Sequence, residues 1–205
     1  IIGQVNAMRS RFKTYKSYAE TNFEKSFLQE ELKDAYVVKS YTFSSSYVEN
    51  QGNGKFKLHE LPLELQTAPI EGVVVSDFNE DGNLDVLMTG NSYATEAATG
   101  RYDAFVGAFL KGNGKGSFEN ISIAESGFLS DWDASGLALI HMGDGRQNIL
   151  AANNDNQLKI FQQTELGNGK VINVGANALS AVIKLKNGQK YKKEFYFGSG
   201  YLSQS

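Results

Sequence analysis

The spacing of apolar residues divides the chain into a helical start and a β-strand remainder. Between residues 9 and 39, apolar side chains recur every three or four positions, as on one face of a helix. They are Phe12, Tyr15 and Ala19, then Phe27 or Leu28, Leu32, Ala35 and Tyr36. Thr21 with Glu24 three residues later forms a capping box, which predicts two helices with a break near residues 20–22. We expect both helices to pack on the rest of the domain rather than to bind a partner.

From Tyr41 onward, apolar and polar residues alternate in short runs separated by glycine turns, which predicts antiparallel β structure. The expected strands are 41–48, 56–61, 72–76, 84–88, 102–110 and 118–123. The turn at residues 52–54 joins the first two strands into a hairpin. The last four strands follow one another through turns and a polar excursion at residues 90–103, so we expect them to form one antiparallel sheet.

The connection between the strands 72–76 and 84–88 carries the clearest chemistry. It reads Asp-Phe-Asn-Glu-Asp-Gly-Asn-Leu-Asp from Asp77 to Asp85, with an oxygen-bearing side chain at every odd position. A tightly curled loop turns alternate residues inward, and calcium takes six to eight oxygen ligands. The expected ligands are the side chains of Asp77, Asn79 and Asp81, the backbone carbonyl of Asn83, and Asp85 directly or through water. Gly82 at the sixth position permits the sharp turn.

The loop differs from an EF-hand, which continues to a glutamate at position 12 and lies between two helices. Here position 12 is Met88, and both flanks are apolar and strand-like. A turn without a metal is the alternative, because Asp, Asn and Gly favour turns anyway. Converging carboxylates repel one another in the absence of a cation, so calcium is the favoured interpretation.

Two parts of the β region repeat. Residues 81–91 resemble residues 144–154, at an offset of 63 (144 − 81), and the Gly-Asn-Gly-Lys turn at residue 52 recurs at residue 112, at an offset of 60 (112 − 52). A period near 60 with short strands and glycine turns is typical of β-propeller blades. In the second copy, the positions of Asp77 and Asn79 are taken by Ile140 and Met142, and only Asp144 and Asn148 remain. We therefore expect no metal there.

Composition narrows the class of protein. The 205 residues include 41% hydrophobic and 21% charged residues, which is ordinary for a globular domain with a core. A net charge of −3 indicates no nucleic-acid partner, and no apolar run is long enough to predict a membrane span. The absence of cysteine excludes disulfides and thiolate metal sites. The start Ile1-Ile2-Gly3 has neither an initiator methionine nor a signal segment, as in a fragment or processed product.

The last stretch predicts a β unit of two or three strands, 171–183 and 191–197, joined by a turn at residues 186–189. The glycine-rich tail that follows has no lysine after its glycines and opens no helix. It is therefore not a nucleotide-binding loop, and we expect a tight return that packs Tyr201 and Leu202.

The motifs resemble a known family. The Asp77–Asp85 loop between apolar strands, with the Gly-Asn-Gly-Lys turn two strands later, resembles the FG-GAP or VCBS repeats of integrin-type β-propellers. The ending Phe197–Ser205 resembles the ASPIC/UnbV module, which is also present in the cartilage acidic protein group. Residues 9–165 resemble the C-terminal part of large repeat proteins from Bacteroidetes.

The resemblance implies a mainly β fold in which partial-propeller blades follow an N-terminal helical pair. The corresponding domains are a helical segment at 1–40, blades at 41–165 and an ASPIC/UnbV-like segment at 166–205. In the family, the acidic loop binds calcium within a blade. A propeller needs several blades, so the remaining ones would come from the rest of a parent chain or from another chain.

Three functions remain open. We expect a non-catalytic, calcium-binding segment of a secreted or cell-surface protein, extracellular or in the bacterial cell envelope, that recognises a protein or a glycan. A purely structural, propeller-closing segment is the second. The third is a polysaccharide hydrolase, with the acids Asp103, Asp131 and Asp133 and the sugar platforms Tyr102 and Trp132.

Catalysis is disfavoured, because the sequence has no Cys–His pair and no G-x-S-x-G elbow. His59 and His141, the only histidines, both fall in expected strands and are interpreted as packing or surface residues. Asp131 and Asp133 flank Trp132 in what we interpret as a solvated loop, because the segment lacks the further ligands that a hard cation requires.

Overall fold

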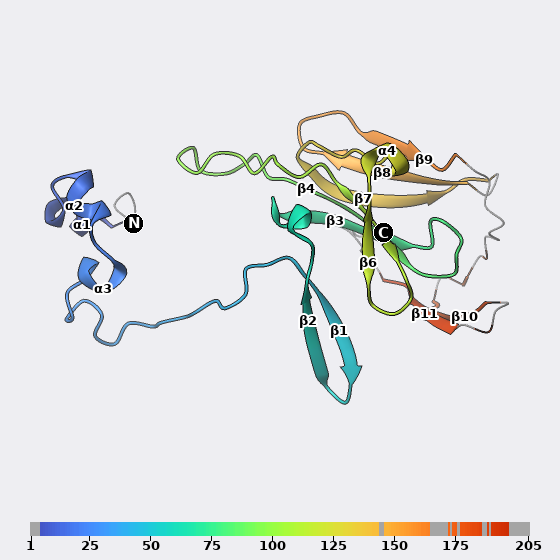
Figure 1. Ribbon diagram of the computed structural model, residues 1–205, viewed down its shortest axis with the longest axis horizontal. Coiled ribbons are helices and arrows are strands. Elements are labelled where there is room, and N and C mark those ends of the chain that lie inside the picture. The colour runs from blue at the N-terminus through green and yellow to red at the C-terminus, as the bar shows by residue number, and fades with distance from the viewer. Residues whose placement is uncertain are drawn as a thin grey trace. The chain divides into compact units, whose positions relative to one another are not determined.

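The computed structural model describes residues 5–143, 146–164, 172, 174–175, 177–185, 188 and 190–196. The chain divides into two units, Ile1–Phe43 and Ser44–Ser205 (Figure 1). Antiparallel sheets dominate the second unit, so the mainly β prediction is confirmed. Within the described ranges, no helix has the length and apolar character needed to cross a membrane.

The first unit contains three short helices, α1 (Asn6–Arg11), α2 (Tyr15–Ala19) and α3 (Phe23–Ser26). Residues 27–39 contain no helix, so the helical prediction is wrong beyond Ser26. Such short helices form few backbone hydrogen bonds to offset the cost of nucleation. At Asp34 the backbone adopts a φ of 60°, which is incompatible with a continuing right-handed helix.

The predicted capping box lies one residue too early. Asn22 is the N-cap of α3, and its side-chain oxygen accepts the N–H of Lys25 at 3.0 Å. Glu24 lies in the first turn of α3, where a negative charge is favourable. The Thr21 prediction is therefore wrong, because asparagine caps a helix at least as well as threonine.

The second unit begins with the hairpin β1 (Ser46–Gly52) and β2 (Lys55–Glu60). The hairpin is confirmed, but no strand forms at residues 41–45. There the Ser45 amide donates to Oε1 of Gln66, and Nε2 of the same side chain donates back to the Ser45 carbonyl at 2.9 Å. These bonds hold Ser45 against the 3₁₀ turn η1 (Leu63–Gln66).

The next four strands form one antiparallel sheet in the order β3-β4-β5-β6, as predicted. They are β3 (Ile70–Ser76), β4 (Asp85–Gly90), β5 (Ala108–Gly112) and β6 (Phe118–Ile121). The expected start of β5 at Tyr102 is wrong, since Tyr102 makes only an isolated bridge with Ser92. The chain turns at Gly107, whose φ is 84°, before β5 begins. A short helix, α4 (Ile123–Ser126), follows β6 and was not predicted.

A second sheet contains β7 (Ala134–His141), β8 (Gln147–Asn153) and β9 (Lys159–Gln162), and a hairpin follows with β10 (Ser180–Lys184) and β11 (Lys190–Glu194). The expected two-strand unit near the C-terminus is present in this shorter form. The predicted ends Val171 and Phe197, most of the 186–189 turn, and the Gly198–Ser205 tail lie outside the described residues.

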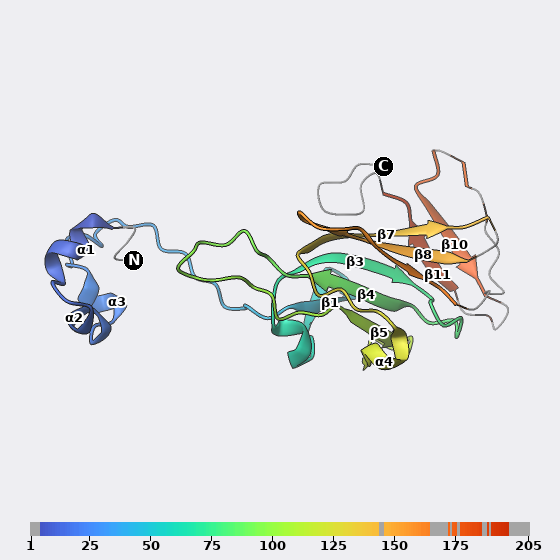
Figure 2. The same cartoon turned by 90° about the horizontal axis from the view of Figure 1, so that it is seen from above.

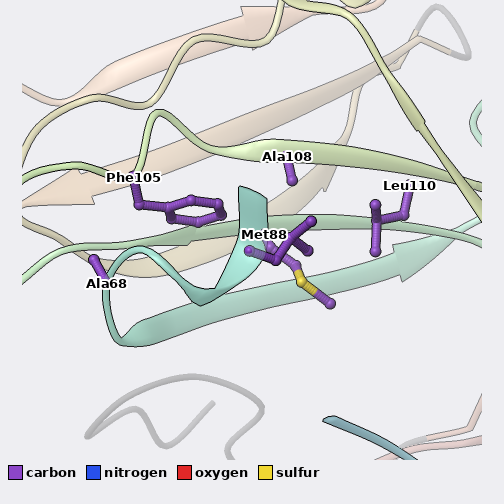
Figure 3. Close-up of a cluster of buried hydrophobic side chains, with 6 residues drawn as sticks. Ala68, Met88, Phe105, Ala108 and Leu110 are labelled. Carbon is purple, nitrogen blue, oxygen red and sulfur yellow. The ribbon is translucent and has the colours of Figure 1, made fainter. Parts of the chain in front are cut away.

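The two faces of the β3–β6 sheet bury different clusters. One cluster combines Met88, Ala108 and Leu110 with Leu65, Ala68 and Phe105 (Figure 3). The other joins Leu87 to Phe128 and to Leu137, Ile149 and Ala151 of the second sheet. Consecutive residues of a strand point to opposite faces, so Leu87 and Met88 separate the two clusters. Figures 1 and 2 show β3 and β4 lying along β7, which is where the second cluster holds the sheets together.

The two sheets have similar bulges in their first strands, at an offset one residue larger than that of the sequence alignment. Bulges interrupt the pairing at Ile70/Gly72 in β3 and at Ala134/Gly136 in β7, an offset of 64 (134 − 70). The partners of Ile70 and Ala134 are Gly90 and Asn153, an offset of 63 (153 − 90). The turn of the second hairpin is therefore one residue shorter than that of the first.

Candidate metal site

The acidic loop connects β3 to β4, whose last facing pair is Ser76 and Asp85. The backbone curls at two residues of the loop, where φ is positive: Glu80 has a φ of 58° and Gly82 a φ of 89°. The value at Gly82 lies in the left-handed region, which glycine adopts without a Cβ penalty. The sequence thus places its most permissive residue where the loop turns most sharply.

Backbone amides hold the first three candidate side chains in place. An oxygen of Asp77 accepts the N–H of Gly82 at 2.9 Å, and Asn79 accepts that of Asp81 at 3.0 Å. Asp81 in turn accepts the N–H of Asn83 at 2.8 Å. Each accepting oxygen retains a second lone pair. The bonds therefore restrain these side chains within the loop and leave them able to bind a cation.

The second carboxylate oxygen of Asp77, Oδ1, is buried and has no hydrogen-bond partner. A buried acceptor without a partner costs about 1–3 kcal/mol, and more when it is charged. The oxygen belongs to the residue at the first ligand position of the loop. A cation bound in the loop would supply the partner that Asp77 lacks.

Asp85 closes the loop from a fully buried position. Its two carboxylate oxygens accept the N–H of Phe78 at 3.0 Å and the N–H of Gly112 at 2.9 Å. The first bond closes the loop, and the second ties it to the end of β5. An ionised carboxylate has about four lone-pair sites, so Asp85 can fasten the loop to the sheet and still offer an oxygen to a metal.

The electrostatics of the loop favour a cation. Burial raises the pKa of both Asp77 and Asp85 above the ordinary value, because loss of water disfavours the charged carboxylate. Amide hydrogen bonds oppose this rise, and the nearby charge of Asp81 adds to it. The nearest ion pair is weak, since Lys111 Nζ lies 3.9 Å from Asp81 Oδ2. A divalent ion would favour all three carboxylates in their charged form.

Asn83 lies against the turn between β5 and β6. A Cβ built on Gly114 would come within 2.3 Å of the Asn83 side-chain oxygen. The asparagine side chain therefore lies close to the backbone of this turn. That Asn83 contributes its backbone carbonyl to a metal stays a prediction.

The second hairpin turn has a different set of residues. Because β7 follows β3 at an offset of 64, the position of Asp77 is taken by His141 rather than by Ile140 as the sequence offset suggested. His141 is exposed at the end of β7. Asp144 and Gly145 lie outside the described residues. Asn148 takes the place of Asp85 (148 − 85 = 63), so a neutral amide stands where the first loop has its buried carboxylate.

The segment around Trp132 is more structured than the predicted solvated loop. Lys159 forms an ion pair with Asp131 and lowers its pKa through a hydrogen bond. The same ammonium lies 4.3 Å from the centre of the Trp132 ring. Asp133 is 6% exposed and accepts the Tyr93 N–H at 3.3 Å, so the solvated-loop prediction is wrong for this residue.

The other candidate residues are dispersed. Asp103 is exposed, and Tyr102 is 45% exposed beside the Ser92 bridge. His59 contacts Glu49 at 2.9 Å and stacks on Tyr47 in the first hairpin. Both Asp131 and Asp133 have structural partners, an ion pair and hydrogen bonds respectively.

Sequence reasoning missed Asn91. It is fully buried, its side chain binds both the N–H and the carbonyl of Phe105, and it also donates to the Trp132 carbonyl at 3.1 Å. It thereby fixes the polar excursion at residues 90–103 and links it to the segment that precedes β7. The signal was present, because Asn91 matched Asn154 in the repeat. The Asn154 side chain donates to Asp133 at 3.2 Å.

In the described part of the chain, no group of three or more Asp, Glu, His or Cys side chains is already arranged to hold a metal. The candidate ligand set of the acidic loop is different, since it includes an asparagine side chain and a backbone carbonyl. No known family, curated protein or solved structure matches the chain.

Proposed function

We propose that this chain is a non-catalytic, calcium-binding segment of β-propeller type. Its calcium ligands are the side chains of Asp77, Asn79 and Asp81, the carbonyl of Asn83, and Asp85. The buried, unpartnered Oδ1 of Asp77 carries the proposal. The raised pKa values of the two buried carboxylates support it.

Calcium is the cation that this donor set favours. All five ligands are oxygens, which a hard cation prefers, and the set contains no imidazole or thiolate for zinc. Bound there, calcium supplies positive charge that neutralises the loop and cross-links its two ends. Because Asp85 also binds the Gly112 amide, the ion acts as a staple between the β3–β4 turn and β5.

The propeller part of the proposal is supported by the way the sheets are built. A four-stranded and a three-stranded antiparallel sheet, each built from strands consecutive in the chain and each with an equivalent bulge, pack face to face. Repeated four-stranded sheets that stack in this way form the blades of a propeller. Neither sheet can bury both faces by itself, so stacking is the means by which each acquires a core.

We further propose that the segment belongs to a secreted or cell-surface protein and contributes to recognition of a protein or a glycan. Calcium is plentiful outside the cell, so a weak site would be filled there. Asp131 and Asp133 have structural partners, which favours this reading over a polysaccharide hydrolase. A purely structural role is the alternative, and a glycan array distinguishes them: saccharide binding retained in Asp77→Asn supports recognition, and no binding supports the structural role.

Calorimetric titration of the chelated chain with calcium chloride tests the metal site. We expect one site in the wild type and none in Asp77→Asn, which removes the charge and keeps the side-chain shape. Asp155→Asn is the matched control, because Asp155 is an exposed aspartate in another turn, with a φ of 51° that asparagine adopts readily.

Thermal unfolding gives a second measure. At about 100 times the dissociation constant, calcium adds about 2.7 kcal/mol of stability, which raises Tm by about 5–10 °C for a chain of this size. Equal melting temperatures in chelator and in saturating calcium would show that the loop binds no calcium.

A further inference from the structure

The interface between the two sheets shows how a face of this type is covered. In the second sheet, Leu137, Leu139 and Ile149 lie on the face that β3 and β4 cover. Leu137 is 8% exposed and Ile149 is 7% exposed. Two strands of the neighbouring sheet are thus enough to bury this face.

The first sheet has the same face, which is covered by Leu65 and Phe105 over β4 and β5 but by no neighbouring sheet in the described residues. By the strand register, Val73, Val75 and Val86 are the counterparts of Leu137, Leu139 and Ile149, at offsets of 64 in the first strand and 63 in the second. Val73 is 44% exposed and Val75 is 37% exposed. The position that Leu137 holds in β7 is therefore buried, whereas the equivalent position of Val73 in β3 is exposed.

The open face forms the floor of a groove of about 820 Å³. Val73, Val75 and Val86 line it, and β1 runs along it through Tyr47 and Val48. The Tyr47 ring packs edge-on against Phe118 of β6 at 5.7 Å between ring centres. Lys190 and Tyr191 of β11 also line the groove, and Val73 and Val75 of β3 stay exposed in it.

The hairpin β1–β2 is the counterpart of β5–β6. In each hairpin the repeated Gly-Asn-Gly-Lys turn joins the two strands, which are antiparallel. In the four-stranded sheet, β4 pairs with the edge of β5 that faces away from β6. In the described chain, β1 pairs only with β2, and no strand occupies its other edge. The hairpin is therefore the outer half of a sheet that lacks the counterparts of β3 and β4.

We propose that the groove receives a β-hairpin from polypeptide outside these 205 residues. One strand of that hairpin adds antiparallel to the free edge of β1, as β4 does to β5. Branched aliphatic side chains on one face of the hairpin cover Val73 and Val75. An added strand gains affinity from backbone hydrogen bonds and specificity from alternate side chains. This inference rests on the propeller-type stacking of the proposed function and is independent of calcium.

The test uses the full 205-residue chain and a synthetic peptide with the sequence of Ile70–Gly90. That peptide is chosen because it is the hairpin that covers the equivalent face of β7. Hydrogen exchange is measured in EDTA and in calcium, with a scrambled peptide for comparison. We expect the peptide to slow exchange of the β1 amides at least about tenfold, because pairing converts exposed amides into hydrogen-bonded ones.

Variants separate the groove from other exposed apolar surface. Val75→Asp places a charge on the groove floor and should weaken peptide binding about tenfold or more, the effect of about 1.4 kcal/mol. Val106→Asp is the matched control, because Val106 is a 41% exposed valine outside the groove lining, with an exposure close to that of Val75. It should leave binding unchanged.

Three results would overturn the inference. The first is unchanged exchange of β1 at about 1 mM peptide, the weak end of specific binding. The second is equal binding by wild type and Val75→Asp. The third is a dimer in sedimentation that Val75→Asp abolishes, since a second copy would then fill the groove. If the peptide docks in EDTA and the chain binds no calcium in the titration, the metal site is refuted and the groove inference stands.

Discussion

The substitution Gly72→Ala tests the packing between the two sheets. A Cβ at Gly72 would lie 2.7 Å from Cγ2 of Thr89, 2.9 Å from the backbone nitrogen of Leu137 and 3.1 Å from the backbone carbon of Gly136. Backbone atoms of the opposing strand cannot rotate away. The Thr89 hydroxyl is hydrogen-bonded to Ser130 inside the core, which restrains that side chain too. The added methyl group therefore has to push the sheets apart.

Overpacking of a core costs about 1–3 kcal/mol, and replacing glycine by alanine returns about 0.4–1 kcal/mol by restricting the unfolded chain. We expect a net loss of about 1–2 kcal/mol for Gly72→Ala. The matched control is Gly136→Ala at the equivalent bulge of β7, where an added Cβ meets no atom within 4 Å. The control should be neutral or gain up to about 1 kcal/mol.

Urea unfolding followed by the fluorescence of Trp132, the single tryptophan of the chain, measures both variants. Gly72→Ala should lower the midpoint at an unchanged m-value, since the same surface is exposed on unfolding. Equal midpoints for the two variants, or a larger loss in Gly136→Ala, would refute the assignment of β3 and β7 as equivalent strands with different surroundings.

Four substitutions address polar groups. Lys159→Met should cost about 1 kcal/mol at neutral pH, because it removes a partly exposed ion pair and a cation–π contact. Lys159 lowers the pKa of Asp131 in the folded state, so this stabilisation is present above the ordinary value of 3.8 and is lost as pH falls through the folded value; urea midpoints of wild type and variant should converge in acid. Asp85→Asn should lose about 1–3 kcal/mol even in chelator, because one of two buried amides loses its acceptor, whereas Asp77→Asn should raise Tm in chelator by removing a buried charge. Asn91→Ala should cost about 2–4 kcal/mol in calorimetry, because it breaks two buried hydrogen bonds and one partly buried one. A loss below about 0.5 kcal/mol would show that the excursion does not depend on Asn91.

The β3–β6 sheet could be predicted from the sequence because its signals are local. Alternating apolar residues, glycine turns and the acidic loop all act within a few positions of one another. The repeat was visible for the same reason. The sequence alignment was one residue off for the first strands of the two hairpins, because the turns differ in length and the sequence does not show which residues pair. The bulges at Gly72 and Gly136 establish that the first strands are offset by 64 residues.

The remaining features depend on contacts between distant residues. Residues 102–106 alternate like a strand, but the side chain of Asn91 takes up both backbone groups of Phe105. Asp133 reads as a loop residue, yet its partners Tyr93 and Asn154 lie 40 and 21 positions away. Neither separation leaves a pattern in a sequence window, so these polar contacts could not be predicted.

The paired bulges make the intervening turn the variable part of each hairpin. Between the two hairpins the turn changes length by one residue, while Val73 and Leu137 keep the same face of their strands. A shift of the pairing register by one residue would have exchanged the two faces. Insertions and deletions in the turn are therefore tolerated without redesign of the packed faces. The turn of β7–β8 is therefore a suitable place to graft the acidic loop.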